Sequence, residues 1–310
     1  MKVIQFTVPV ADEGSVVIQE DILPYFYNYL HRHKEAQVTL IIKGEGTLIA
    51  GNYTQPFKAG EIYVIAANQP HMFKGDAKYF ENLQEKNIHA IHIFFDHDNA
   101  LKGLLALPEM DTVKKFLLLT RTSLQLPAAY EERTAADILR ISRLHGPERL
   151  LAFVSMLLFF SKQVKDWKSL STGFSRYAYS ESEGLRMNDI YQYTLEHYAE
   201  NITLGKIASV AHLTTYAFCK YFKKHTRKTY LGFLNEIRIN AACKKIISGE
   251  FDSIASVAYA TGYNNPITFN RVFRKVTGMS PSAYARKYRF GDDGAHRDGH
   301  ILELEEYGDQ

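Results

Sequence analysis

The sequence predicts an α+β protein in which a small antiparallel β-barrel or jelly roll precedes an all-α bundle. Short β-branched stretches separated by glycine turns occupy the first 98 residues and indicate the β-rich part. Apolar residues at three- and four-residue steps indicate helices from residue 99 onward. A pattern of two short helices joined by a turn then occurs twice, with matching positions 51 residues apart.

The β-rich part is predicted from its β-branched runs and from the turns between them. The predicted strands are residues 38–42, 47–50, 57–65 and 89–95. Gly44 and Gly46 separate the first two strands, Gly51-Asn52 offers a tight turn, and Gly60 marks another turn. Many short strands at close intervals leave edges that must be closed, and a barrel or jelly roll closes them.

The helical segment that follows is predicted at residues 112–124, 131–144 and 147–167. The third helix has the widest apolar stripe, formed by Leu150, Leu151, Val154, Leu157 and Leu158. Such a stripe needs a partner, either the outside of the barrel or the same helix of a second subunit, and we expect a homodimer. The most apolar run, residues 150–160, is shorter than the roughly 20 residues that span a bilayer, so no membrane partner is expected.

The second copy of the two-helix pattern lies in residues 253–284. Its first helix places Ile254, Val257 and Ala258 on one face. Gly262 supplies the positive φ of a tight turn, Asn265 can cap the next helix, and Pro266 suits the first helical position.

The second helix of this copy has two contrasting faces. The inward stripe is predicted to be Phe269, Val272, Phe273 and Val276. The opposite face carries Ile267, Asn270, Arg271 and Arg274. This face can donate several hydrogen bonds and has no acid. The pair of helices therefore indicates a helix-turn-helix whose second helix fits the major groove of DNA.

The first copy, residues 206–230, follows the same plan. Its buried positions are Ile207, Ala208, Ala211, Phe218, Tyr221 and Phe222, and its outward positions are Tyr216, Cys219, Lys220 and Lys223. Thr214 can cap its second helix. Residues 230–247 contain no proline and predict one connecting helix, which would hold the two motifs at a fixed separation.

These motifs resemble the AraC/XylS family of bacterial transcription regulators over residues 185–289. The most specific positions run from Ile254-Ala255 through Gly262-Tyr263 and Gly278 to Ser280-Pro281 and Tyr284. The resemblance implies two motifs in consecutive major-groove segments of double-stranded operator DNA. It also implies base contacts from Tyr216, Cys219, Lys220, Ile267, Thr268, Asn270 and Arg271. The cations expected at phosphates are Lys206, Lys223, Lys224, Arg274 and Lys275.

The first copy has Arg227 where the second has Gly278. An arginine adopts a left-handed helix end at a higher free-energy cost than glycine does. Either this helix ends differently or Arg227 reaches a phosphate.

Charge is distributed unevenly along the chain. The net charge of +3 divides into −1 for residues 1–184, +10 for residues 185–290 and −6 for residues 291–310. A positive third beside a near-neutral body is typical of a nucleic-acid module, although a lysine-rich helical surface alone would give the same balance. The acidic tail is either a solvated segment or a competitor of DNA for the basic face.

Cysteine usage and the first residues bear on localisation. Cys219 and Cys243 have no metal-ligand spacing and suggest a reducing cytoplasm without disulfides. Cys219 either contacts DNA or fills space. The first 14 residues lack the apolar core of an export signal, so a cytoplasmic protein is expected.

The N-terminal part resembles a cupin, a small barrel whose mouth often holds a metal between imidazoles and a carboxylate. The resemblance rests on residues 31–37 (HRHKEAQ), residues 57–71 (FKAGEIYVIAANQPH) and the turn at residues 44–46. It brings together His31, His33, Gln37 and His71. Gln37 occupies the carboxylate position, where an amide is a weaker metal ligand, although Glu35 could point to the same side as His33.

Two interpretations of these residues follow. His31, His33 and His71 could hold a metal, or the histidines and Gln37 could line an effector pocket or be hydrogen-bonded at its rim; the second is preferred, and no cofactor is expected. His89 and His92 lie on opposite faces of a regular strand, so at most one of them could join the group.

The predicted organisation is a cupin-like sensor domain (1–98), a helical coupling and dimerisation segment (99–168), a linker rich in serine (169–184), a DNA-binding bundle with two helix-turn-helix motifs (185–290) and an acidic tail (291–310). The predicted function is transcription regulation in response to a small molecule such as a sugar or a related metabolite. RNA polymerase is a further candidate partner.

Two other functions compete with this prediction. A metal-dependent cupin enzyme, an isomerase or a dioxygenase with an accessory basic domain, would need a carboxylate ligand and an acid–base pair that the sequence does not supply, so we expect no enzyme. RNA binding is disfavoured because side chains cannot enter the deep, narrow major groove of A-form RNA.

Overall fold

The structure is a computed structural model that describes residues 6–8, 10, 14–76, 79, 85–170, 180–249 and 251–289. It separates into two compact units, unit 1 (Met1–Ile237) and unit 2 (Arg238–Gln310). The predicted acidic tail and the middle of the predicted linker, residues 171–179, lie outside the described residues. No helix of the described segments is long and apolar enough to cross a membrane.

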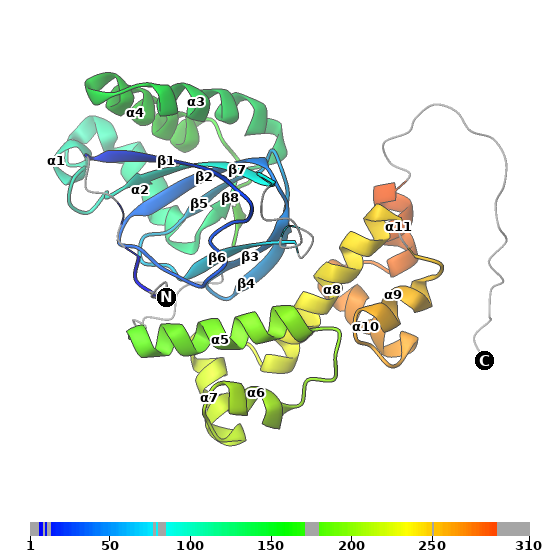
Figure 1. Cartoon of the computed structure of the whole chain (residues 1–310). Helices are drawn as coiled ribbons and strands as arrows, with labels where there is room; N and C mark the ends of the chain where they lie inside the picture. The colour runs from blue at the N-terminus through cyan, green and yellow to red at the C-terminus, as the bar shows by residue number, and fades with distance from the viewer. Residues whose placement is uncertain are drawn as a thin grey trace, which may run out of the picture. The chain divides into compact units, whose positions relative to one another are not determined.

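Unit 1 contains two antiparallel sheets (Figure 1). The larger has the strand order β1-β7-β2-β5-β8-β9, with β1 at Val16–Leu23, β2 at Ala36–Lys43, β5 at Ile62–Ile65, β7 at Ile88–Phe95, β8 at Leu124–Gln125 and β9 at Lys168–Ser169. The smaller has the order β4-β3-β6, with β3 at Gly46–Ala50, β4 at Tyr53–Phe57 and β6 at His71–Gly75. Two facing sheets fit the jelly-roll alternative of the prediction.

The central strands β2 and β7 of the larger sheet are buried on both faces. One face of β2 and β7, including Val38 and Ile93, packs against helices. The other face, including Ile41 and Ala90, packs against the smaller sheet. A strand buried on both faces is continuously apolar, which explains why residues 38–42 lack an alternation of polar and apolar residues.

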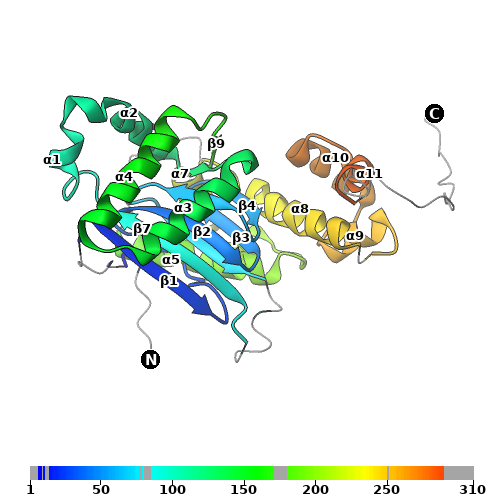
Figure 2. The same ribbon diagram turned by 90° about the horizontal axis from the view of Figure 1, so that it is seen from above.

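A helical layer covers the outer face of the larger sheet, and α3 and α4 lie across its strands (Figure 2). Its helices are α1 (Lys102–Leu105), α2 (Asp111–Leu119), α3 (Glu131–Arg143) and α4 (Gly146–Lys162). Of the predicted apolar stripe, Leu157 is buried, Leu150, Val154 and Leu158 are partly buried against this core, and Leu151 is 69% exposed. Packing within the chain therefore accounts for most of the stripe.

Helix α5 (Glu181–His197) lies against the smaller sheet (Figure 1). It begins inside the predicted linker because Ser180 and Glu183 form a capping box. The side chain of Asn188 accepts a hydrogen bond from the backbone N–H of Leu30 at 2.9 Å, and Lys74 Nζ donates to Gln192 Oε1 at 2.6 Å. These bonds join the β-rich part to the helices that follow.

The remaining helices form the two motifs. Unit 1 includes α6 (Leu204–Val210), α7 (Thr215–Thr226) and the first half of α8 (Tyr230–Ser248). These helices pack around one core, which contains Phe218, Phe222 and Phe233. Unit 2 includes the second half of α8 with α9 (Ile254–Ala260), α10 (Pro266–Thr277) and α11 (Pro281–Arg289) (Figure 1). Its core contains Phe269 and Phe273.

Several boundaries differ from the predicted ones. Strands β1 and β6 were not predicted, since β1 contains exposed polar residues and β6 is short and begins with histidine. Of the predicted strand 57–65, only Ile62–Ile65 forms a strand of its own, β5, after the predicted turn at Gly60. Phe57 is the last residue of β4, which was otherwise not predicted. The third predicted helix ends at Lys162, five residues early.

Candidate nucleic-acid interface

Both ends of α10 are fixed by its sequence. The Asn265 side chain accepts a hydrogen bond from the Ile267 N–H at 2.8 Å, and Pro266 occupies the first turn, which confirms the predicted start. Gly278 ends the helix in the left-handed conformation with φ +80°. The position of the helix within unit 2 is set by Phe269 and Phe273, both fully buried.

The opposite face of α10 is open to solvent. Ile267 is 78% exposed, and Asn270, Arg271 and Arg274 are exposed. Thr268 is half-buried. One position of the predicted inward stripe is wrong: Val276 is 40% exposed, because the apolar face of this short helix is already filled by the two phenylalanines and Val272.

A groove with a volume of about 630 Å³ runs beside α10. It is lined by Ile254, Asn270, Arg271, Arg274, Lys275, Ser280, Pro281 and Ser282. Among the described residues, three cations and two hydroxyl groups line the groove and no acid does, which suits an anion. Ser280 and Ser282 were not predicted as groove residues, although the Ser280-Pro281 pair signals the start of α11.

Helix α7 repeats the construction of α10 at an offset of 51 residues. The Thr214 hydroxyl accepts a hydrogen bond from the Ala217 N–H at 3.3 Å, as predicted. Near the other end, Thr226 Oγ1 donates to Phe222 O at 2.8 Å, and Thr277 Oγ1 donates to Phe273 O at 2.9 Å. The repeat therefore extends to individual hydrogen bonds.

The two motifs differ in the residues that adopt positive φ. Arg227 ends α7 at φ +58° with the same backbone hydrogen bond that Gly278 makes in α10, so α7 does not end differently. In the turn between the paired helices, His212 has φ +53° where Gly262 has φ +85°. The first motif thus uses side-chain-bearing residues at both left-handed positions.

The predicted outward residues of α7 are all exposed. Tyr216 is 81% exposed, and Cys219, Lys220 and Lys223 are exposed. Lys224 differs from them, because its Nζ lies 3.8 Å from Glu183 Oε1. Formation of a phosphate contact by Lys224 would compete with this ion pair.

The structure also brings together the four residues predicted in the sensor part. His31, His33 and His71 converge, with one nitrogen from each within 4.8 Å of the others. The Nδ1–H of each ring donates to a backbone carbonyl, namely Tyr29 O, Glu35 O and Gln69 O, at 2.8 to 2.9 Å. These bonds leave the Nε2 lone pairs for other partners. Glu35 is not part of the converging group.

Gln37 ties this group to a neighbouring histidine. Its side-chain amide lies 2.9 Å from His33 Nε2, 2.5 Å from Thr39 Oγ1 and 2.8 Å from His92 Nδ1. His89 instead lies 2.6 Å from Glu20 at the solvent edge, so one of the two β7 histidines joins the group, as predicted. Thr39 was not predicted as a member of this group; its position two residues after Gln37 in β2, on the same face of the strand, was the available signal.

Burial keeps the converging histidines neutral. It lowers the pKa of His31 to about 4 and holds the pKa values of His33 and His71 below the ordinary value. Three neutral imidazoles suit a borderline ion such as Zn²⁺. His71 Nε2 is buried and without a hydrogen-bond partner in the described chain, as a ligand nitrogen would be, whereas His33 Nε2 would have to leave Gln37.

Comparisons with known proteins agree with both halves of this description. Residues 207–287 match a family model described as a helix-turn-helix domain, and residues 23–79 match one described as a cupin domain. The MmsAB operon regulatory protein of Pseudomonas aeruginosa is 32% identical over 111 residues, which are 36% of this chain and 36% of that protein. The chain therefore spans about a third of the length of that relative.

Other matches extend over most of the chain. The HTH-type transcriptional activator RhaS of Escherichia fergusonii is 23% identical over 92% of this chain and 95% of its own length. Among solved structures, ToxT from Vibrio cholerae covers 88% of this chain and 98% of its own, at 16% identity and a TM-score of 0.35. The chain therefore contains a cupin domain followed by an AraC-type helix-turn-helix domain, and the relatives named above are described as transcription regulators.

Proposed function

We propose that the chain is a sequence-specific DNA-binding transcription regulator that inserts α7 and α10 into consecutive major-groove segments. The observation that supports this most directly is the exposure of polar and cationic residues along both helices, beside fully buried phenylalanines. A helix with one buried face and one solvent-facing donor face has the form that major-groove binding requires. The relatives named above are themselves described as regulators.

The exposed faces supply the donors that distinguish base pairs. Arg271 and Lys220 would pair with the O6 and N7 atoms of guanine, and Asn270 with the N6 and N7 atoms of adenine. Ile267 and Tyr216 would contact thymine methyl groups, since both are exposed despite their apolar surfaces. Cys219 and Thr268 border these positions and are proposed as further base contacts.

Phosphate contacts would fix the orientation of each motif. In unit 2, the groove beside α10 offers Arg274, Lys275, Ser280 and Ser282, with the N-terminus of α11 at Pro281. Free N–H groups and the helix dipole at such a terminus favour an anion. In unit 1, Lys206 and Lys223 would serve the same purpose, and Lys224 would do so after leaving Glu183.

Binding-site selection with the purified chain tests this proposal. Random duplexes bound by the protein should yield a defined sequence, and affinity for it should fall with salt. If about six phosphates are neutralised, the slope of log K against log salt is close to −5. Failure to enrich any sequence, or an affinity independent of salt, would overturn the proposal.

The sensor half would couple a chemical signal to this binding. The cupin domain is the proposed receptor of a small-molecule effector, with His31, His33, Gln37 and His71 as the candidate contacts. The exposed Leu151 of α4 supports a homodimer through the helical layer. RNA polymerase is the proposed partner at the promoter, and the bacterial cytoplasm is where a regulator of this kind would act.

The converging histidines support a second candidate, a metal-dependent cupin enzyme. Equilibrium dialysis against Zn²⁺ with the native chain and a His71→Ala variant tests it. Stoichiometric zinc that is lost in the variant would establish a metal site, and turnover that needs the metal would favour the enzyme. A DNA-binding affinity that is the same with and without zinc would show that the proposed regulatory function does not depend on the metal.

A further inference from the structure

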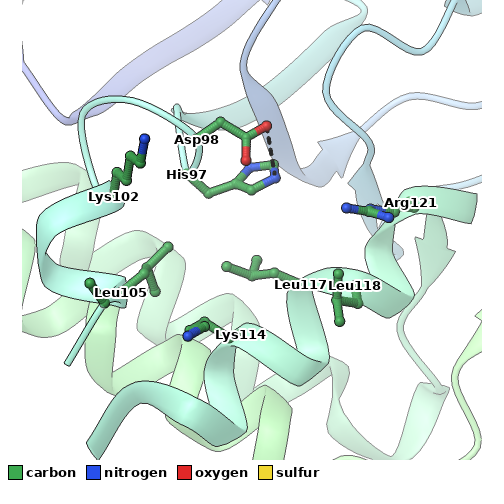
Figure 3. A pocket seen from close by; sticks show the side chains of 9 residues that line it. His97, Asp98, Lys102, Leu105, Lys114, Leu117, Leu118 and Arg121 are labelled. Atoms are coloured by element: carbon green, nitrogen blue, oxygen red, sulfur yellow. Dashed lines mark ion pairs between the residues drawn. The ribbon is translucent and has the colours of Figure 1, made fainter. Parts of the chain in front are cut away.

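A pocket opens on the helical layer of unit 1, outside the group of histidines (Figure 3). Its volume is about 540 Å³, within the range of roughly 300 to 1,000 Å³ that small-molecule sites occupy. It is lined by His97, Asp98, Lys102, Leu105, Ala106, Lys114, Leu117, Leu118 and Arg121. None of these residues is distinguished by a motif in the sequence.

Two short helical faces form the walls of this pocket. On α2, Lys114 is followed by Leu117 and Leu118 at three- and four-residue steps, and Arg121 continues the same face. On α1, Lys102 is followed by Leu105 and Ala106 with the same spacing. Each wall therefore combines a cation with apolar side chains one turn further along the helix.

The apolar part of the pocket is firmly held. Leu105 and Leu117 are 6% and 5% exposed and belong to the core beneath the helical layer. Leu118 is 55% exposed, so a large apolar side chain faces solvent beside the cations. Removing it from water would favour a ligand that has an apolar body.

The charges of the pocket are unbalanced. Three cations, Lys102, Lys114 and Arg121, line the pocket with one acid, Asp98, so positive charge is in excess. His97 Nε2 lies 3.7 Å from Asp98 Oδ2. No carboxylate of the described residues lies within 4 Å of any of the three cations, whereas the neighbouring Lys115 is paired with Asp111 at 2.7 Å and does not line the pocket.

From these observations we propose that the pocket binds an organic acid, a carboxylate attached to an apolar body. Arginine can grip a carboxylate with two parallel hydrogen bonds, and the lysines add charge without fixed geometry. Among the described residues, no Asn, Gln, Ser or Thr lines the pocket, so apart from the His97 ring it lacks the uncharged hydrogen-bonding side chains that would orient the several hydroxyl groups of a sugar. An inorganic anion would leave the leucines without a partner.

This proposal extends the proposed function by naming a ligand class for the sensor half, and its test does not involve DNA. The full chain is titrated by calorimetry with octanoate, dodecanoate and phenylacetate. At least one of them is expected to bind saturably with one site per chain. Octanamide and inorganic phosphate, which lack the charge and the apolar body respectively, should each bind at least about tenfold more weakly than that acid.

Two variants and one control locate the site. Lys114→Gln and Arg121→Gln should each weaken binding of the acid about tenfold, because each removes a charge-assisted hydrogen bond. Lys115→Gln changes the adjacent residue of the same helix, outside the pocket, and should leave the affinity within about twofold. All three positions are exposed, and thermal melting checks that each variant is folded.

Three results would each overturn the proposal. The first is the absence of saturable binding by every acid of the panel. The second is an acid whose affinity is unchanged by both pocket variants. The third is phosphate or octanamide binding as tightly as the acid. Because the readout is ligand binding alone, failure here leaves the DNA-binding proposal standing, and the selection experiment can fail while the pocket still binds its acid.

Discussion

At residue 184 the backbone of α5 lies directly against the ring of Phe6. Phe6 is fully buried, and a Cβ atom added to Gly184 would overlap its ring. Phe6 also belongs to a short bridged segment, since the backbones of Phe6 and Val8 hydrogen-bond to Arg32 at 2.8 Å. Gly184 therefore allows α5 to pack closely against this segment. The requirement for glycine here comes from this close contact and not from the backbone conformation, which is helical.

Gly184→Ala should destabilise the protein by about 1 to 3 kcal/mol, because overpacking forces the ring or the helix to move. Gly205→Ala is the matched control, since a Cβ at that helical position meets only the Thr203 hydroxyl at 3.9 Å. The control should be neutral or stabilising by about 0.5 to 1 kcal/mol. Urea unfolding midpoints measure both, and equal effects of the two substitutions would contradict the packing argument.

His212 and Arg227 adopt left-handed backbone conformations that cost a side-chain-bearing residue about 1 kcal/mol or more. Arg227→Gly should therefore raise the free energy of unfolding by roughly 0.5 to 1 kcal/mol. Gly278→Ala, at the equivalent position of the second motif, should lower it by a similar amount. Chemical denaturation of both variants tests the pair, and a loss of stability in Arg227→Gly would show that the arginine side chain outweighs the backbone strain.

Residue-level prediction succeeded where a local rule applies. The caps at Thr214 and Asn265 follow from side chains that bond their own backbone, so sequence alone identified them. The left-handed φ of His212 was not predictable, because histidine gives no local signal for it. The contact between Phe6 and Gly184 was equally unpredictable from the sequence, because it joins positions 178 residues apart.

At the scale of elements, α10 is the helix whose chemistry is most readily tested. Arg271→Ala should weaken binding to the selected DNA by about 1 to 3 kcal/mol and relax the preference at one base pair, because a guanine contact is lost. Arg286→Ala on the exposed face of α11 is the control and should leave base preference unchanged. An equal loss of affinity for all sequences in Arg271→Ala would argue for a phosphate contact instead.

His31, which pairs with His71 of β6 through an isolated bridge, is a group whose protonation opposes folding. The pKa of His31 is lowered to about 4 by burial, whereas the unfolded chain titrates near 6.5. The unfolded state therefore binds more protons between these values, and stability present above pH 6.5 is lost as the pH falls toward 4. His33 and His71 shift in the same direction.

For the metal-free protein in chelator, His31 should lower the free energy of unfolding by up to about 1.4 kcal/mol per pH unit between pH 6.5 and 4, and His33 and His71 should add to the loss in the same direction. Urea titrations at successive pH values measure the slope, and His31→Gln should flatten it. A stability that stays constant from pH 7 to pH 5 would contradict the buried, neutral state of these rings.

Element-level prediction depended on how regular each segment is. The strands at β2 and β7 and the helices α3, α7 and α10 have long apolar runs or clear start signals, and the sequence identified them. Strand β6 was missed because its five residues acquire their strand conformation by pairing with β3, a contact that no local pattern encodes. The pocket on the helical layer was missed for a similar reason, since α1 and α2 meet only in the fold.

At the scale of the whole molecule, the charge distribution separates the part of the chain that contains both helix-turn-helix motifs from the part that contains the sheets. Positive charge is concentrated in residues 185–290, which contain both motifs, while residues 1–184 are nearly neutral. Helix α8 contributes its first half to the core of unit 1 and its second half to the core of unit 2. In the proposed function, this helix would connect two DNA-contacting motifs, as the sequence predicts.

The most direct test of this account is hydroxyl-radical footprinting of the full chain on a selected duplex. Two protected segments should appear, their centres one helical turn of about 10 base pairs apart, and Lys220→Ala and Arg271→Ala should each weaken only one of them. A single protected segment, or one from which both variants remove protection equally, would contradict the claim that α7 and α10 occupy consecutive major-groove segments.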